Sequence, residues 1–351
     1  MNARHKAVLV GCGEMSGAWL SALRDFYKDR VEVVGLVDLN EKAAVSKAAE
    51  FGLTGIWIGS SLEDTLRKTR PDLLFNCTIA EAHTPTCEAA LNAGCHVLVE
   101  KPLALTVAEG IHLKNVAATA GSVLAVIQNR RYLPGAIAVK KALAEGCIGR
   151  VNALYADFFL GPRFGGFRES MRHPLLLDMA IHTFDQCRYL TDLDPEWVVC
   201  HEFNPSGSWY AHGASAIALF EMKGGVLFSY RGSWCARGFP TAWAGTWRIV
   251  GEQGTLLWDG ETKVEVERVN GARTGKALVE DVERISFPIM ALKPAQLGHA
   301  GNIGEFLDAV DSGTLPQTNA DDNLKSLAMV EAAIESALSS QPVSMHNLLS
   351  L

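Results

Sequence analysis

The sequence lacks a long hydrophobic run, a paired cysteine motif and a cluster of basic residues. No uninterrupted apolar segment approaches the roughly 18 residues of a membrane span, and the apolar stretch 7–10 is too short for the core of a signal peptide. The eight cysteines among 351 residues include no C-x-x-C pair. Scattered cysteines in a chain of this length are typical of small buried side chains in a reducing compartment. We therefore expect a cytoplasmic protein without disulfides or a zinc site.

Charged residues are also sparse. Only 20% of residues are charged, the formal net charge is −7, and no long run of Lys and Arg occurs, which argues against a nucleic-acid or membrane-surface partner. The hydrophobic fraction of 48% is too high for a disordered chain and ordinary for a globular one. At about 150 residues per domain, the length predicts two compact domains.

The first third of the chain alternates short apolar runs with segments of helical spacing. The expected strands are residues 7–10, 31–37, 56–58, 73–77, 96–99 and 123–127. Strands that alternate with helices predict right-handed crossovers and a parallel, doubly wound sheet of the Rossmann type. We expect this dinucleotide-binding domain to cover residues 1–130.

The pattern changes in the second part, residues 131–351, which we expect to form an α+β domain. A helix at 136–145, a strand at 151–159 and a helix at 174–190 come first, and two helices at 302–312 and 321–339 finish the chain. Between them, the expected strands are residues 197–203, 214–222, 226–234, 246–250, 255–258, 263–269 and 284–287. Successive strands without intervening helices predict a mostly antiparallel sheet.

A glycine turn follows the first expected strand. Gly11 permits a tight turn, Gly13 lets the backbone approach a pyrophosphate, and Ser16 is small enough for close packing of helix on strand. Asp38 ends the second strand, 27 residues after Gly11, where a carboxylate receives the ribose hydroxyls of NAD and repels the extra phosphate of NADP. Asp38 is equally placed to cap the next helix, as is Asn40. Together these features predict binding of NAD rather than NADP.

The helix expected at 174–190 carries a narrow ionisable stripe. At about 100° per residue, Asp178, His182 and Asp185 fall within roughly 60° of one another on a cylinder that is otherwise almost entirely apolar. A buried helix with such a stripe faces a cleft or a polar partner. A buried structural network is the alternative interpretation. A metal ion would need a third ligand, and none stands at a matching spacing, so we expect no metal.

Two further segments supply positive charge. Lys101 follows the fifth strand at the carboxyl edge of the sheet, where open α/β sheets bind ligands. The loop 161–174 carries three arginines, Arg163, Arg168 and Arg172. It also carries Phe164 and Phe167, and both rings are suited to stacking on a sugar. The arginines can bind a carboxylated or phosphorylated sugar, remain solvated, or pair with acids of a neighbouring subunit.

Several of these motifs occur together in one family. In chain order these motifs are the turn Gly11-Cys-Gly-Glu-Met, Thr78-Ile-Ala-Glu-Ala-His83, Glu100-Lys-Pro102, Gln128-Asn-Arg-Arg-Tyr132, Asp178-x-x-x-His182-x-x-Asp185 and Val250-Gly-Glu-Gln-Gly-Thr255. In this combination the sequence resembles the glucose-fructose oxidoreductase, inositol dehydrogenase and rhizopine-catabolism group (Gfo/Idh/MocA), over nearly the whole chain.

The resemblance implies a Rossmann domain followed by a domain with an open, mostly antiparallel sheet, and oxidation or reduction of sugars, inositols or related polyols with NAD or NADP. From the residue types of the loop 161–174 we expect Arg163, Phe164 and Arg168 as substrate contacts, beside Asp178 and His182, and the resemblance implies that Lys101, Asp178 and His182 are catalytic. The residues that it implies for the cofactor are Gly11, Gly13, Glu14, Met15, Asp38, Thr78, Ala80, His83, Glu100, Lys101 and Gln128.

The sequence departs from the family pattern at two points. Thr78-Ile79 stands where many members have Thr-Pro, and Arg172-His173-Pro174 replaces a run of glycines before the helix of the stripe. The second change leaves the substrate open.

The resulting hypothesis is hydride transfer between a secondary alcohol and nicotinamide, with His182 as base and Lys101 stabilising the alkoxide. The alternatives are a glycosidase that oxidises its sugar transiently with tightly held NAD, and a nucleotide-sensing protein without catalysis. The resemblance also implies a homodimer or homotetramer formed through the open sheet. Whether Trp197, Trp234, Trp247 and Trp258 face that surface or pack inward is left open.

Overall fold

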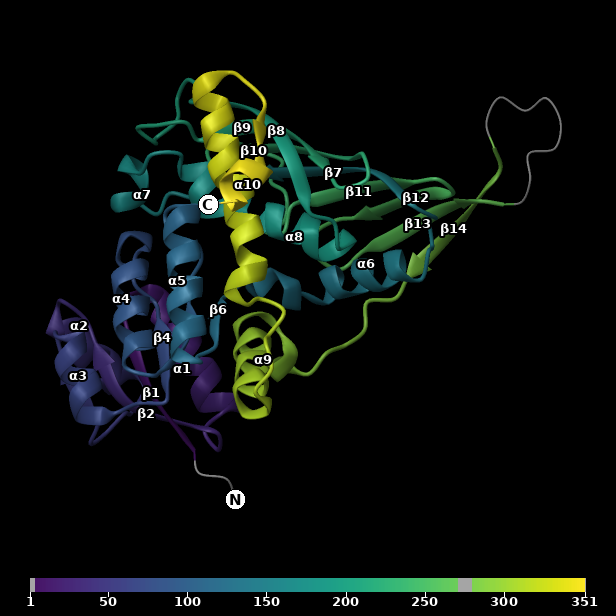
Figure 1. The fold of residues 1–351 in the computed structure, drawn as a ribbon. Helices are drawn as coiled ribbons and strands as arrows, with labels where there is room; N and C mark the ends of the chain where they lie inside the picture. The colour runs from purple at the N-terminus through teal and green to yellow at the C-terminus, as the bar shows by residue number, and fades with distance from the viewer. Residues whose placement is uncertain (1–3, 271–279, 351) are drawn as a thin grey trace. The chain divides into compact units, whose positions relative to one another are not determined.

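The computed structural model describes residues 4–270 and 280–350. By its contacts the chain divides into two units, shown in Figure 1. The first unit comprises Met1–Tyr132 and Lys293–Leu327, and the second comprises Leu133–Leu292 and Ala328–Leu351. The first unit therefore takes in a late segment of the chain as well as the N-terminal part.

The described part of the first unit contains a six-stranded parallel sheet with the strand order β3-β2-β1-β4-β5-β6. Its strands are β1 (His5–Val10), β2 (Val31–Val37), β3 (Trp57–Gly59), β4 (Leu73–Asn76), β5 (His96–Val99) and β6 (Leu124–Val126). Its helices are α1 (Glu14–Phe26), α2 (Glu41–Glu50), α3 (Leu62–Thr69), α4 (Ala80–Asn92), α5 (Val107–Ala120), η1 (Asn129–Tyr132), η3 (Pro294–Gln296) and α9 (Gly298–Ser312). The reversal of strand order between β1 and β4 makes this a Rossmann sheet, as predicted.

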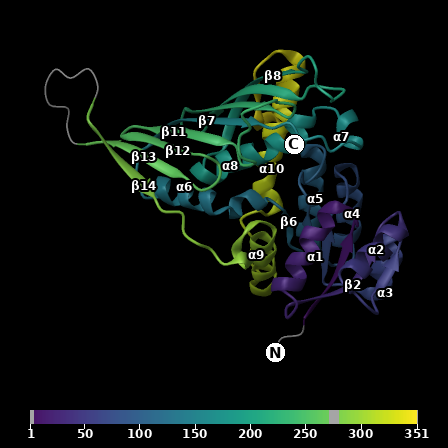
Figure 2. The ribbon, with the colours of Figure 1, turned by 180° about the vertical axis from the view of Figure 1, so that it is seen from behind.

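Both faces of this parallel sheet are covered by helices. Helices α1, α2 and α9 bury their apolar sides in one cluster, which includes Trp19, Phe75 and Phe306. On the other face α4 packs against α5. Figure 2 shows α1 and α9 beside each other. Because both faces are buried, strands such as β2 consist almost wholly of apolar residues, which explains why the sequence predicted them.

The described part of the second unit contains a nine-stranded sheet, called here the open sheet, with the order β14-β13-β12-β11-β7-β10-β9-β8-β15. Its strands are β7 (Val151–Phe159), β8 (Pro195–Phe203), β9 (Ser215–Met222), β10 (Val226–Ser233), β11 (Thr246–Gly251), β12 (Gly254–Trp258), β13 (Val264–Val269), β14 (Val282–Phe287) and β15 (Val343–Ser344). Strands β7 and β10 pair in parallel and the other neighbours are antiparallel, which confirms the expected mostly antiparallel sheet.

The helices of the second unit include a break that the sequence analysis did not foresee. The helices are α6 (Pro134–Ala144), α7 (Phe167–Ser170), the π-helical turn η2 (Leu175–Ala180), α8 (Ile181–Thr191) and α11 (Met345–Leu349), while α10 (Ala320–Ser339) belongs to both units. A single α-helix over 174–190 was expected. The structure corrects this: Leu175–Ala180 form the π-helical turn η2, and the α-helix α8 begins only at Ile181.

In the part of the chain that the structure describes, helices cover only one face of the open sheet. Figure 1 shows α6 and α8 against it. Along β9 buried side chains alternate with exposed ones, and the exposed set includes Ile217 and Leu219. Such alternation is expected for a sheet with one packed and one open face. Trp234, Trp247 and Trp258 are buried, so these three tryptophans pack inward.

The cysteines behave as small apolar side chains. All eight lie within the described ranges and are free, and only Cys77 is less than fully buried. Burial raises the pKa of Cys12, Cys87 and Cys200 to about 12. Among the described residues, no helix is both long and apolar enough to cross a membrane.

Candidate functional site

The turn between β1 and α1 requires glycine at one position and offers open space at another. Gly11 has φ +87°, and a Cβ atom there would lie 2.6 Å from the backbone of Cys77. A Cβ on Gly13 would meet no atom within 4 Å. Gly13 also begins α1 without any side-chain cap, so the first N–H groups of the helix are available to a ligand. This arrangement fits the pyrophosphate of a dinucleotide.

Asp38 joins the end of β2 to the glycine turn. Its Oδ2 accepts a hydrogen bond of 2.8 Å from the N–H of Cys12, and its Oδ1 accepts one of 2.8 Å from the N–H of Asn40. Asn40 is the N-cap of α2 but makes no side-chain cap bond. Asp38 thus both orders the start of α2 and stands beside the glycine turn, as a ribose-binding carboxylate must.

The loop after β4 is tied to the loop after β5 by a histidine. The ring of His83 contacts the carbonyl oxygen of Pro102 at 2.6 Å and that of Thr78 at 3.1 Å. Burial lowers the pKa of His83, although both carbonyl oxygens favour its charged form. Because the ring is buried and both nitrogens are engaged, His83 acts by holding the two loops. Thr78 and Ala80 themselves are half-buried at the start of α4.

A buried carboxylate stands directly before Lys101. Glu100 Oε1 accepts a hydrogen bond of 2.9 Å from Trp19 Nε1 and lies 3.8 Å from His299 Nε2, and Oε2 accepts a bond of 3.2 Å from the N–H of Lys101. Burial alone would raise the pKa of Glu100. The facing charges of His299 and Lys101 and the Trp19 bond outweigh burial, so this pKa lies below its ordinary value. We call this cluster of Trp19, Glu100, Lys101 and His299 the Glu100 corner.

The remaining predicted cofactor residues differ widely in exposure. Glu14 and Met15 are exposed in the first turn of α1. Gln128 is buried, and its side-chain amide has no hydrogen-bond partner among the described residues. Next to it, Asn129 contacts Nδ1 of His299 at 3.4 Å, which adds a second contact to the histidine of the Glu100 corner.

In the second unit, the predicted stripe lies across the junction of η2 and α8. His182 is 8% exposed and Asp185 is 1% exposed, and the polar Gln186 and Arg188 are buried as well. Asp178 lies in the π-helical turn, which winds with more residues per turn than an α-helix. The angle calculated for the stripe at 100° per residue therefore does not hold for Asp178. Burial of the helix itself is as expected.

Asp178 is paired with an arginine of the preceding loop. Arg168 Nε donates to Asp178 Oδ2 at 3.1 Å, and the guanidinium lies 5.2 Å from the ring centre of Phe164 and 4.9 Å from that of Phe167. Tyr210 lies within the electrostatic reach of this pair. Burial, with the charge of Asp178, raises the pKa of Tyr210 to about 12.

The other arginines of the loop have different surroundings. Arg163 stacks on Trp209 at 4.2 Å, and Arg172 is exposed. His173, which follows, has φ +52° and contacts Glu202 Oε2 through Nδ1 at 2.5 Å. The contact with Glu202 therefore holds His173 in a backbone conformation that glycine adopts more easily.

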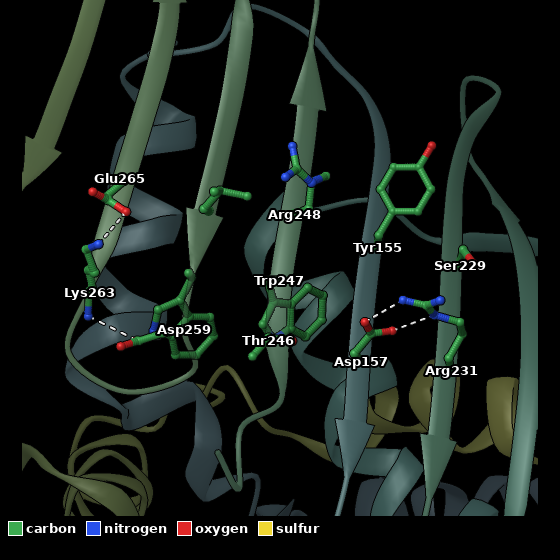
Figure 3. A pocket seen from close by; sticks show the side chains of 12 residues that line it. Tyr155, Asp157, Ser229, Arg231, Thr246, Trp247, Arg248, Asp259, Lys263 and Glu265 are labelled. Atoms are coloured by element: carbon green, nitrogen blue, oxygen red, sulfur yellow. Dashed lines mark hydrogen bonds and ion pairs between the residues drawn. The ribbon is translucent and has the colours of Figure 1, made fainter. Parts of the chain in front are cut away.

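A separate hollow of about 690 Å³ lies on the exposed face of the open sheet. Figure 3 shows Asp157 of β7 paired there with Arg231 of β10, at 2.7 and 2.6 Å, with Tyr155 on the same strand as Asp157 and Arg248 on the neighbouring strand β11. None of the predicted site residues, all of which are described, lines this hollow. The part of the chain that the structure describes contains no group of three or more His, Cys, Asp or Glu residues arranged to hold a metal ion.

Comparison with known families agrees with both units. Residues 5–128 match the model described as "Oxidoreductase family, NAD-binding Rossmann fold", and residues 136–257 match the "GFO/IDH/MocA C-terminal domain". The chain belongs to the Gfo/Idh/MocA family of oxidoreductases. Its first unit is accordingly an NAD(P)-binding Rossmann domain.

Individual relatives are similar over their full length. The D-apiose dehydrogenase of Paraburkholderia graminis is 28% identical over 98% of this chain and 91% of its own. The 1,5-anhydro-D-fructose reductase of Ensifer adhaerens is 26% identical over 95% and 96%. An oxidoreductase from Agrobacterium radiobacter, solved with NAD+, L-tartaric acid and magnesium, shares the fold with a TM-score of 0.86 at 21% identity, over 99% of this chain and 100% of that one.

Sequence reasoning missed the partners of Glu100 and Asp178. Trp19 was not among the predicted site residues, yet a buried indole N–H needs an acceptor, and that requirement is a usable signal. His299 lies almost 200 residues from Glu100, and nothing in the spacing connects them. Arg168 was a candidate for the substrate, but its bond to Asp178 was not foreseen.

Proposed function

We propose that this protein is an NAD-dependent dehydrogenase that oxidises a secondary alcohol of a sugar, inositol or related polyol, or reduces the corresponding ketone. Lys101, Asp178 and His182 are its catalytic residues. The observation that carries the proposal is that the buried His182 of α8 follows the half-buried Asp178 of η2 by four residues, in a chain of a family of oxidoreductases. A protein that only senses a nucleotide has no use for a proton-transfer pair.

Each residue has a role that follows from its chemistry. His182 takes the hydroxyl proton of the substrate, since imidazole titrates near neutral pH. Lys101 stabilises the negative charge that develops on the same oxygen. Asp178 orients the substrate hydroxyl or the imidazole. When bound, NAD supplies the hydride acceptor.

The choice of NAD over NADP rests on Asp38. Its carboxylate stands beside the glycine turn and would repel a 2′-phosphate, whereas it can accept hydrogen bonds from ribose hydroxyls. The relative from Agrobacterium radiobacter was solved with NAD+, which supports the same choice.

The substrate class is supported by the relatives. The D-apiose dehydrogenase and the 1,5-anhydro-D-fructose reductase act on carbohydrates, as their names state. In the second unit, the exposed rings of Phe164 and Phe167 and the guanidinium groups of Arg163 and Arg168 are suited to bind a hydroxylated ring.

We further propose a homodimer or homotetramer formed through the exposed face of the open sheet. This face carries Tyr155, Phe203, Ile217, Leu219 and Leu227, each at least 38% exposed, and apolar strands of this extent are a surface that a second copy would cover. Light scattering of the wild type and of Ile217→Asp tests this proposal. A monomeric wild type would contradict it.

The activity is tested by a screen of polyols, aldoses and sugar acids with NAD and with NADP, followed by the absorbance of the reduced cofactor. A dehydrogenase forms stoichiometric NADH. A glycosidase that recycles its NAD would release product without net NADH, and a sensor would bind nucleotide without turnover. Either result would replace the proposed reaction.

A further inference from the structure

The loop 161–174 of the second unit is built around one guanidinium group. Arg168 Nε is bonded to Asp178 Oδ2, and the two side chains are 30% and 12% exposed. The terminal Nη1 and Nη2 atoms of Arg168 have no hydrogen-bond partner among the described residues. The edge of the fork that faces away from Nε therefore remains available to a ligand.

Aromatic rings hold this guanidinium in place. Phe164 and Phe167 lie 5.2 and 4.9 Å from it and are themselves 53% and 51% exposed. Phe164 in turn packs on the buried Trp234, with ring centres 6.0 Å apart. A cation between two rings is fixed in orientation and partly shielded from water, which strengthens its pairing with an anion.

The other charged groups of the loop are arranged differently. Arg163 is stacked on Trp209, whose Nε1 donates to the carbonyl of Pro162 at 3.1 Å. Arg172 is exposed, and Glu169 is half-buried. Arg168 is thus the one arginine of this loop that bridges toward a proposed catalytic residue, Asp178.

We propose that Arg168 binds a carboxylate of the substrate, and that the preferred substrates are sugar acids. This inference rests on the proposed function. A planar carboxylate matches the free Nη1–Nη2 edge with two parallel hydrogen bonds. A phosphate dianion fits less well, because the charge of Arg168 is already shared with Asp178.

The experiment compares matched substrates that differ only in the acidic group. D-galactose is paired with D-galacturonate, and D-glucose with D-glucuronate and with D-glucose 6-phosphate. The readout is the ratio of kcat/KM between acid and neutral sugar with NAD, together with the melting temperature of the NADH-bound protein at saturating ligand. The variants are Arg168→Gln and Arg168→Lys. The control is Arg150→Gln, since Arg150 Nε pairs with Glu252 at the same 3.1 Å on the exposed surface of this unit.

We expect wild type and Arg150→Gln to prefer the uronates by about 10- to 100-fold, the scale of one charge-assisted hydrogen-bonded pair. In Arg168→Gln the ratio should fall to about one, and Arg168→Lys should keep an intermediate ratio, because lysine retains the charge but not the fork. Any orienting effect of Arg168 on Asp178 acts on both sugars alike and cancels in the ratio.

The outcomes separate the inference from the function on which it rests. Turnover of neutral sugars at equal or higher kcat/KM than uronates overturns the inference and leaves the dehydrogenase intact. A higher kcat/KM for D-glucose 6-phosphate than for D-glucuronate overturns the proposal that Arg168 binds a carboxylate. If no compound is turned over, the proposed function is in difficulty, but a melting-temperature rise with uronates that is lost in Arg168→Gln still supports the carboxylate site. No rise in the wild type rejects it.

Discussion

The two regions that carry the proposed catalytic groups hold them in contrasting ways. The Glu100 corner is a buried network in which one carboxylate receives donors from α1 and from the start of its own loop and faces a histidine of α9. The loop 161–174 instead exposes two phenylalanine rings and meets Asp178 through a half-exposed arginine.

The contrast follows from what each region must bind. A nicotinamide dinucleotide is the common ligand of this family's Rossmann domains, so the groups around it can be fixed by a buried network. Substrates differ, and a loop with exposed rings and arginines changes specificity without disturbing a core. The variants below test whether the two regions are as separable as this comparison implies.

The largest effect is expected from His182→Ala. Loss of the base should lower kcat by about 10² to 10⁴, whereas the Kd for NADH, measured by fluorescence titration, should stay unchanged because the first unit is intact. His201→Ala, which removes an exposed histidine of the same unit, serves as the control. Equal losses in turnover and nucleotide affinity would assign His182 a structural role.

Gly11→Ala should damage the first unit most. A Cβ at 2.6 Å from the Cys77 backbone, at φ +87°, should cost about 3 kcal/mol or more of unfolding free energy in urea titrations. Gly13→Ala is the matched variant, because its Cβ meets nothing within 4 Å. It should unfold within about 0.5 kcal/mol of the wild type and yet bind NADH more weakly. Normal NADH binding by Gly13→Ala would contradict the pyrophosphate assignment.

Asp38→Asn should change cofactor choice with little change in stability. The amide keeps an acceptor for the N–H of Cys12 or Asn40 but removes the charge that repels a 2′-phosphate. The ratio of the Kd for NADPH to that for NADH should fall by about tenfold, the scale of one charged hydrogen bond. A ratio that does not move would show that Asp38 serves the turn alone.

His299→Leu should have the smallest effect at neutral pH, about 1 kcal/mol of unfolding free energy. The folded-state pKa of Glu100 lies below its unfolded value, so the carboxylate contributes stability above the unfolded pKa and loses it as the pH falls through the folded one. Without His299, burial raises the folded-state pKa of Glu100, so the variant is destabilised while the carboxylate is ionised and regains stability as the pH falls through that raised pKa. The deficit of the variant relative to the wild type should therefore shrink on acidification.

Melting curves between about pH 7 and about pH 5 measure this trend. His83, Cys77 and Lys101 also face Glu100 and remain in the variant, so the comparison isolates His299. His112→Leu breaks an exposed pair with Glu88 and is the control, expected to show no such recovery in acid. If the melting temperatures of the two variants change with pH in parallel, His299 does not set the pKa of Glu100.

Much of the fold could be predicted because its strands are buried in a regular way. The expected strands at 31–37 and 151–159 coincide with β2 and β7, since a run of apolar residues or a strict alternation allows only one arrangement. The glycine turn was equally predictable, because the φ of Gly11 follows from the strand–turn–helix geometry itself.

The site was harder to predict where contacts join distant segments. The π-helical turn 175–180 cannot be distinguished from an α-helix in an almost wholly apolar sequence, because both bury such a segment. Which face of the open sheet the tryptophans occupy could not be predicted for a related reason. A shift of one residue in strand register exchanges the two faces. In the structure Trp258 lies against Gly135 of α6, and Trp247 stacks on Phe228 and Trp258, so both are buried.

The cysteines are distributed so that their alkylation rates can report the unfolding of each unit. Cys12, Cys77, Cys87 and Cys95 lie in the first unit, and Cys147, Cys187, Cys200 and Cys235 in the second. Alkylation needs access of the reagent to the thiolate, so buried thiols alkylate slowly until their surroundings unfold. Timed exposure to iodoacetamide followed by peptide mass spectrometry would therefore report the stability of each unit separately, without any added label.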